Sequence, residues 1–520
     1  MKVLDNRKYF IGAFFLFFSI VYISRLFYVQ IFTDQYFDRA KRVSVELIEE
    51  YPMRGNIYDR DGSVLVQNEI AYDIMYTAHR SKIDTVSFCK LLGIDTTEFI
   101  KRAKKSERYS SRKASVFESL ITGNEYGPIR EKLHQFKGMS VKTRTVRNYP
   151  QDAGGHVLGY LKRVNRKDSE RDDYYGDNDY IGSSGIERFY EKELRGEKGY
   201  KYFLKNINGN HIGSYQNGVM DKTPVAGKNL KLSISGELQA YGELLMSGKR
   251  GAIVAIEPET GEVLAMISAP SYDPNKLVGR QFSSNYYALE KDPNKILYQR
   301  AIKSAQPPGS IVKTMQSLIA LEMGIANENT RYACNKELVG CHNHPGPLNL
   351  PESIQNSCNP YYYNLVKNIF YKGKGSGNMG ALRSGMDDWE KYVRSFGMGS
   401  KIGIDIYGEK EGNVPDTREY DQIYGRNRWN YRTIYSLAIG QGEFSLTPLQ
   451  MANLATAIAN KGFYYTPHFI KSIGDSVVDY SNDTMRHVTM ITPSTFELVH
   501  KGMQWVVEEP GGTARIARIE

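Results

Sequence analysis

The chain begins with an apolar run that is long enough to cross a lipid bilayer, and this run restricts what its N-terminus can fold into. Residues 9–32 are apolar, aromatic or small apart from a few polar positions, and Arg25 is their only charge. In lipid such a segment forms a helix, because only its own carbonyls can satisfy its backbone N–H groups. The bulky residues Phe27, Tyr28, Ile31 and Phe32 do not suit signal-peptide cleavage, so we expect an uncleaved transmembrane anchor over residues 9–32.

The charges that flank this run predict its orientation. Lys2, Arg7 and Lys8 lie in the short tail 1–8. By the positive-inside rule this tail stays in the cytoplasm and the rest of the chain is exported. We therefore expect a single-pass protein whose folded part lies outside the cytoplasm.

Composition divides the exported part into two regions. Residues 33–225 are rich in charge, tyrosine and short β-like runs such as 63–66 and 72–76, which predicts an α+β pedestal domain. The second domain, residues 226–520, opens with a strand-like run at 229–234 and a helix containing Leu238–Leu245. Two apolar runs, 251–258 and 262–268, then flank Glu259-Thr260-Gly261, which predicts a β-hairpin.

The formal net charge of +10 does not indicate nucleic-acid binding, because the basic residues are interleaved with acidic ones and no nucleic-acid motif accompanies them. We read the basic segment 101–113 as a solvated surface, including its Ser110 and Lys113. The charge balance suits a cationic envelope protein that lies near anionic lipid.

A serine and a lysine three residues apart give the strongest catalytic signal. In Gln306–Lys313 two prolines and a glycine precede Ser310, while residues 314–323 favour a helix that Gly324 ends. Ser310 and Lys313 therefore lie on one helix face, at a terminus that favours negative charge, so Lys313 can act as a base for a Ser310 nucleophile. The alternative is a helix-capping serine followed by a surface lysine.

A second hydroxyl and an amide follow at Ser357 and Asn359, between a helical stretch and Tyr361-Tyr362-Tyr363. A hydroxyl near Ser310 and Lys313 can relay a proton to a leaving amine, and an amide can hold a substrate peptide group. Taken alone, these two residues suit an ordinary interhelix turn better than a catalytic role, because both residue types are common in such turns.

Three of the four cysteines, Cys334, Cys341 and Cys358, cluster around His342 and His344, whereas Cys89 is remote. Three thiolates and one imidazole make a closed tetrahedral zinc site. A Cys334–Cys341 disulfide or unpaired buried thiols explain the spacing equally well.

These motifs resemble those of the class B penicillin-binding proteins over nearly the whole chain. The resemblance is closest to their elongation-specific group, penicillin-binding protein 2. The matching segments are Arg54–Gly62, Arg147–Pro150, His156–Tyr160, Gly185-Ile186-Glu187, Gly403-Ile404-Asp405, Gly440-Gln441-Gly442 and Thr447–Gln450, together with the serine-x-x-lysine element Ser310–Lys313 and Ser357-Cys358-Asn359.

The resemblance implies an α+β fold with three parts: a transmembrane helix, a pedestal or dimerisation domain, and a transpeptidase domain whose antiparallel sheet is flanked by helices. It implies a peptidoglycan D,D-transpeptidase of cell elongation in the bacterial inner membrane, with its catalytic domain in the periplasm. Ser310, Lys313, Ser357 and Asn359 would be catalytic. Implied partners are stem peptides, β-lactams, a SEDS-family lipid-II polymerase and elongation-complex scaffolds. Rival functions are a non-catalytic envelope scaffold, a division-specific penicillin-binding protein 3, and a serine β-lactamase or β-lactam sensor.

Two further expectations come from the resemblance. Relatives of Gram-negative bacteria carry a zinc ligand directly after the second-motif serine, a position held here by Cys358, which favours structural Zn²⁺ on Cys334, Cys341, His344 and Cys358, with His342 as the alternative ligand. The family's lysine-threonine-glycine strand normally follows a segment like Gly511–Glu520. It is absent from this sequence, so we expect a truncated chain with an open sheet edge and weak labelling by fluorescent penicillin.

Overall fold

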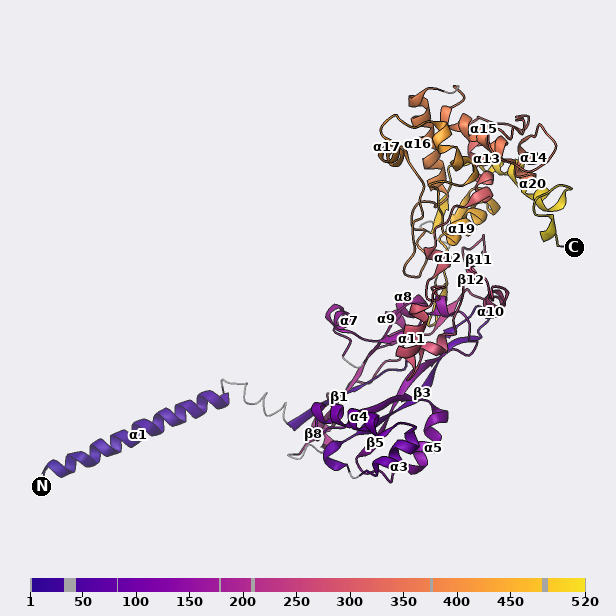
Figure 1. Ribbon diagram of the computed structural model, residues 1–520. Coiled ribbons are helices and arrows are strands. Elements are labelled where there is room, and N and C mark those ends of the chain that lie inside the picture. The colour runs from indigo at the N-terminus through magenta and orange to yellow at the C-terminus, as the bar shows by residue number, and fades with distance from the viewer. Residues whose placement is uncertain are drawn as a thin grey trace. The chain divides into compact units, whose positions relative to one another are not determined.

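The computed structural model describes residues 2–31, 44–81, 83–176, 179–206, 211–374, 377–478 and 485–519 (Figure 1). The chain divides into two compact units: Met1–Arg54 with Arg195–Gly227, and Gly55–Leu194 with Lys228–Glu520. Helices and antiparallel strands alternate without regular βαβ repeats, which confirms the expected α+β class.

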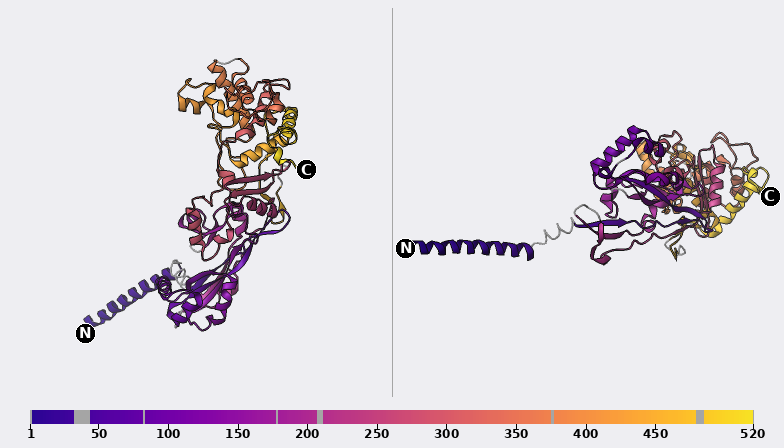
Figure 2. Two further views of the ribbon diagram at one scale, coloured as in Figure 1. Left: turned by 45° about the vertical axis from the view of Figure 1, so that its right-hand side comes forward. Right: turned by 90° about the horizontal axis from the view of Figure 1, so that it is seen from below.

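The first unit contains the predicted anchor and a small sheet. Helix α1 (Lys2–Ile31) is uninterrupted in Figures 1 and 2, and its Arg7–Ile31 portion is long and apolar enough to cross a membrane. It fits a single-pass anchor, although residue 32 of the expected span lies outside the described residues. The sheet consists of β1 (Val45–Glu50), β8 (Gly199–Lys205) and β9 (His211–Ser214), paired antiparallel in that order. The 3₁₀ turn η2 (Tyr215–Gly218) follows.

In the second unit one long strand organises the pedestal portion. The β-like runs predicted at 63–66 and 72–76 are parts of the single strand β3 (Val64–Tyr76), because β5 (Met139–Asn148) pairs with it from Gln67 to Tyr76, across the polar residues that separate the two runs. β4 (Ser115–Ile121) pairs with the end of β3. Helices α3 (Thr85–Leu92), α4 (Thr96–Tyr109) and α5 (Gly123–Leu133) surround an aromatic core. This core includes Phe88, Phe99, Phe117 and Phe136.

A buried ion pair and a tight glycine contact connect three of the segments that carry the family resemblance. Arg147 Nε, on β5, donates to Glu187 Oε1 on α8 (Gly185–Phe189) at 2.7 Å, and both side chains are at most 2% exposed. Gly185 has φ +62°, and a Cβ there would lie 2.3 Å from the Val157 carbonyl oxygen. A side chain at position 185 would therefore push α8 away from α6 (Gly155–Leu158).

The strand predicted at 229–234 is present as β10 (Leu230–Leu232), but it does not join the hairpin that follows it. It pairs parallel with β2 (Ile57–Tyr58) and antiparallel with β14 (Ile470–Ile473), and it thereby enters a sheet in the order β15-β14-β10-β2-β3-β4. Strands from distant parts of the sequence thus hold the pedestal portion and the C-terminal portion together. The remaining elements of this region are η1 (Ala78–Arg80), β6 (Leu161–Arg163), α7 (Arg166–Arg171), β7 (Tyr180–Gly182), α9 (Glu191–Arg195) and β15 (Ser476–Val477).

The predicted hairpin is confirmed as β11 (Gly251–Ile256) and β12 (Val263–Ala269). α10 (Gly236–Leu245) packs on β12, and α19 (Pro448–Ala459) packs on β11. Within the described residues β11 pairs with β12 alone, so its outer edge is open. α10 exposes Leu238, Tyr241 and Leu244.

The helical portion is built around α13 (Val312–Glu322), most of which is buried. α14 (Leu350–Gln355), α15 (Asn359–Tyr371), α16 (Met379–Ser395) and α20 (Phe496–Glu508) pack against it (Figure 1). Gln316 joins α13 to its surroundings: its Oε1 accepts from Trp389 Nε1 on α16 at 2.8 Å, and its Nε2 donates to the Leu437 carbonyl at 3.2 Å. The other elements here are η3 (Pro274–Leu277), α11 (Phe282–Lys291), α12 (Arg300–Lys303), η4 (Gly309–Ile311), α17 (Thr417–Tyr424), α18 (Tyr431–Ile434), η5 (Tyr435–Ile439), β13 (Phe463–Tyr465), β16 (Arg486–Val488), η6 (Pro493–Thr495) and η7 (Arg515–Ala517).

Candidate active site

Ser310 lies in η4, a single 3₁₀ turn that leads directly into α13. Gly309 precedes it with φ +64°, a conformation that favours glycine. The Gly309 N–H donates to the Gly440 carbonyl at 2.9 Å, and a Cβ on Gly440 would lie 2.3 Å from the Gly309 carbonyl oxygen. The Gly440-Gln441-Gly442 segment therefore holds the turn that presents Ser310, and Ser310 itself is exposed where a substrate can reach it.

Lys313 is the buried member of the pair, at 2% exposure. Its Nζ donates to the Ser357 carbonyl at 2.7 Å, to Ser357 Oγ at 2.9 Å and to Asn359 Oδ1 at 2.6 Å. Burial lowers the pKa of Lys313 to about 8, because an ammonium loses its hydration there. A substantial neutral fraction is thus present near physiological pH, as a general base requires.

Ser357 connects the other two groups. Its hydroxyl donates to Ser310 Oγ at 3.1 Å while it accepts from Lys313 Nζ. No hydrogen bond found among the described residues joins Lys313 directly to Ser310, so the path between them runs through Ser357. Ser357 has φ +48°, a left-handed conformation that is unfavourable for serine and that often marks a functional constraint.

Asn359 stands at the start of α15 with both ends of its amide engaged. Its Oδ1 accepts from Lys313, and its Nδ2 donates to the Gly340 carbonyl at 2.7 Å. The structure thus brings together all four residues predicted to be catalytic, from η4, α13, the turn before α15 and the first residue of α15. Their chemical roles remain predictions.

Sequence analysis did not identify two residues that contribute to this site. Tyr362 places its ring 5.5 Å from Lys313 Nζ, and its hydroxyl hydrogen-bonds Ser317 Oγ at 2.7 Å. Gly340 supplies the carbonyl that orients Asn359. The tyrosine triplet at 361–363 was visible as a signal, but nothing in the sequence distinguishes Tyr362 from its neighbours. A backbone carbonyl leaves no sequence signal at all.

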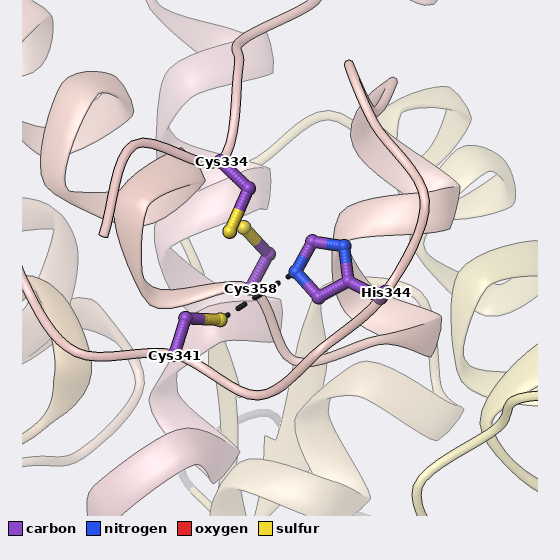
Figure 3. A group of neighbouring side chains, drawn as sticks. All are labelled: Cys334, Cys341, His344 and Cys358. Carbon is purple, nitrogen blue, oxygen red and sulfur yellow. Dashed lines mark hydrogen bonds between the residues drawn. The ribbon is translucent and has the colours of Figure 1, made fainter.

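The four predicted metal ligands converge (Figure 3). The ligand atoms of Cys334, Cys341, His344 and Cys358 all lie within 4.8 Å of one another, and Cys341 Sγ is 3.5 Å from His344 Nε2. Zinc bonds of about 2.3 Å to sulfur and about 2.0 Å to nitrogen place tetrahedral ligands about 3.5–3.8 Å apart, so this donor set fits zinc.

The orientation of the His344 ring also suits a ligand role. His344 Nδ1 pairs with the Pro345 carbonyl at 2.7 Å, which leaves Nε2 to face the sulfur atoms. The alternative ligand, His342, is exposed and lies outside the group. All four cysteines of the chain are free thiols in this structure, so the Cys334–Cys341 disulfide is not formed in it.

Comparisons with known proteins agree with this geometry. The family models for the penicillin-binding protein transpeptidase domain and for the penicillin-binding protein dimerisation domain match residues 251–520 and 49–232. Peptidoglycan D,D-transpeptidase MrdA of Escherichia coli K12 is 31% identical over 95% of this chain and 78% of its own length. MrdA of Acinetobacter baumannii is 32% identical, over 87% of this chain and 67% of its own length.

Among solved structures, the complex of penicillin-binding protein 2 with MreC from Helicobacter pylori matches with a TM-score of 0.69 and 26% identity, over 90% of this chain and 86% of that one. The identity over most of both chains, the two matching domains and the shared architecture all point to one family. The chain therefore belongs to the penicillin-binding proteins and, within them, to the elongation-type serine peptidoglycan D,D-transpeptidases.

Proposed function

We propose that Ser310 carries the acyl group in this transpeptidase reaction. Neutral Lys313 takes up a proton through the Ser357 hydroxyl as Ser310 Oγ attacks the carbonyl carbon of a terminal D-alanyl-D-alanine. The new Oγ–C bond replaces the C–N bond, and D-alanine leaves with the proton returned through Ser357. The amine of a second stem peptide then attacks the ester, which releases Ser310 and crosslinks the two strands. The unbroken path Lys313–Ser357–Ser310, with links of 2.9 and 3.1 Å, carries this proposal.

Formation of a covalent adduct with a β-lactam tests the assignment. In the native protein, intact-mass spectrometry should show one adduct per chain, and Ser310→Ala should abolish it. Lys313→Met should slow its formation by about 10²–10⁴-fold, the usual contribution of general base catalysis. An adduct that persists in Ser310→Ala would place the nucleophile elsewhere.

We also propose that the chain occupies the inner membrane once, with the transpeptidase portion in the periplasm, as Lys2, Arg7 and Lys8 support. Its partners would be a SEDS-family lipid-II polymerase and an elongation scaffold. One similar structure contains MreC, and another concerns a peptidoglycan synthase complex that coordinates polymerization with crosslinking. Co-purification from detergent extracts tests this proposal, and recovery of neither partner class would contradict it.

We propose that the thiol cluster holds Zn²⁺ on Cys334, Cys341, His344 and Cys358. When bound, the ion supplies a structural crosslink with no open coordination position. Three of these residues lie in the loop that also carries Gly340, while Cys358 lies between Ser357 and Asn359. The crosslink would therefore fasten that loop to the turn that contacts Lys313.

Metal analysis of the purified protein should find one zinc per chain, and Cys358→Ser should lower the bound zinc strongly. A zinc-free protein with a Cys334–Cys341 crosslink detected by mass spectrometry would exclude the site.

A further inference from the structure

The outward face of α4 carries a dense cationic surface. Its buried side consists of Phe99, Ala103 and Ser106. On the opposite side four cations fall within about 100° of arc at 100° per residue. These are Lys101, Lys104, Lys105 and Arg108, and all four are exposed.

Most of this charge is not neutralised by ion pairs. No ion pair involves Lys104, Lys105 or Arg108 within the part of the chain that the structure describes. Lys101 contacts Glu98 at 3.4 Å with its side chain 78% exposed. The helix also carries the exposed Glu107 at the flank of this face. The four cations therefore exceed the carboxylates near them.

The turn after α4 extends the surface. Ser110 Oγ accepts the backbone N–H groups of Arg112 and Lys113 at 3.3 and 3.0 Å, which fixes the turn and leaves both side chains exposed. Two large apolar side chains flank the cations: Ile100 at 49% exposure and Tyr109 at 73%. Lysines and arginines attract anionic headgroups, and apolar side chains beside them can contact the boundary between headgroups and acyl chains.

The location of the chain favours lipid as the occupant of this surface. Helix α1 fits a membrane anchor, and residues 32–43, even fully extended, reach at most about 40 Å from it to the folded part. The unit of β1, β8 and β9 is thus held close to a bilayer surface, and the chain continues from it at Gly55 into the unit that carries α4. Anionic headgroups attract clustered lysines and arginines over about one Debye length.

We propose that the α4 surface, defined as Lys101, Lys104, Lys105, Arg108, Arg112 and Lys113, binds anionic phospholipid headgroups of the membrane that holds α1. This contact is independent of the transpeptidase chemistry. It gives the protein a second attachment to the bilayer and restricts how the pedestal portion can turn above it.

Lysine footprinting of the full chain in nanodiscs tests the proposal. With about 30 mol% phosphatidylglycerol in phosphatidylcholine, acetylation of Lys101, Lys104, Lys105 and Lys113 should slow by about fivefold relative to pure phosphatidylcholine. Lys461, which follows α19, is exposed and serves as the internal reference. Added salt should abolish the protection, and soluble glycerol phosphate should not reproduce it.

Two variants that remove equal charge distinguish the effect of the α4 surface from the effect of the protein's net charge. The triple variant Lys104→Gln, Lys105→Gln and Arg108→Gln should return Lys101 and Lys113 to the rates seen in phosphatidylcholine. The control variant Arg166→Gln, Lys167→Gln and Arg171→Gln removes equal charge from α7 and should keep their protection. Three results would each overturn the proposal: equal acetylation rates in both kinds of nanodisc, an equal loss of protection in both variants, or protection that requires an added acidic protein.

Discussion

The environment of Lys313 sets the chemistry of the site. Burial lowers the pKa of Lys313, whereas the nearby Cys341 and Cys358 raise it, and burial has the larger effect. The resulting pKa of about 8 leaves about a tenth of the lysine neutral at pH 7. The site is thus close to the pH at which a base accepts and returns a proton efficiently.

The acylation rate should follow this ionisation. Because only neutral Lys313 accepts a proton, the second-order rate constant for a fluorescent penicillin should rise about tenfold per pH unit below pH 8 and level off above it. Stopped-flow measurement on the native protein gives the profile, with Ser310→Ala as the blank. A profile that is flat between neutral and alkaline pH would remove Lys313 from the role of base.

Substitution of Asn359 should move that profile. Asn359→Asp places a carboxylate where the amide oxygen now lies, 2.6 Å from Lys313 Nζ, and an adjacent anion raises the pKa of an ammonium. The rate profile should shift to higher pH by about one unit or more. Asn359→Ala removes the same acceptor without adding charge and should show no alkaline shift. Identical profiles in the two variants would contradict this electrostatic account.

At the residue scale, local spacing identified what lies on one helix or turn. Ser310 and Lys313 are a local pair, and the helix-breaking residues Pro308 and Gly309 indicated that they lie at the start of a helix. The relay through Ser357 was predicted only in outline, because its position depends on how the turn before α15 packs against α13. The Asn359–Gly340 contact was not predicted, since it involves a carbonyl that any residue would offer.

At the level of elements, the stability of the fold should depend strongly on the buried ion pair between β5 and α8. Glu187→Ala leaves the Arg147 guanidinium buried without its carboxylate, which should cost about 3–5 kcal/mol of unfolding free energy. Denaturant titration measures this loss. As the control, Glu170→Ala breaks the exposed Arg166–Glu170 pair on α7 and should cost less than about 0.5 kcal/mol. Similar losses in both variants would mean that burial does not set the cost.

The proposed zinc crosslink makes a prediction for stability. Removal of the metal with a chelator should lower the melting temperature by about 5 °C, which is ~5 kcal/mol for a chain of this size. Cys341→Ser should already be destabilised and should not respond to the chelator. Cys89→Ser provides the matched control, because Cys89 is a buried thiol on α3 outside the cluster, and its response should equal that of the parent protein. A parent protein that does not respond would argue against a structural metal.

Element prediction succeeded where contacts are local and failed where partners are distant. The hairpin β11–β12 and the bounds of α13 follow from apolar pattern and turn residues. The partners of β10 do not, because β2 and β14 lie far away on either side of it in the sequence. The polar stretch within β3 likewise concealed a single long strand that β5 completes.

For the molecule as a whole, α1 should account for stable membrane attachment. The full chain should remain in the membrane fraction after a high-salt wash, since insertion of an apolar helix does not depend on salt. A chain that lacks residues 1–31 should be released by the same wash, because headgroup attraction at the α4 surface is screened. Retention of the shortened chain in washed membranes would reveal a further membrane-inserted segment.

The hydrogen bond between Trp389 and Gln316 makes tryptophan fluorescence an intrinsic reporter on the active-site helix. The chain has three tryptophans, and Trp389 and Trp429 are almost fully buried. Trp389 donates its indole N–H to a residue one turn beyond Lys313 on α13. Any rearrangement of that helix on acylation alters the polarity around this indole. Emission from the native protein can therefore follow the active-site helix in real time without an added dye.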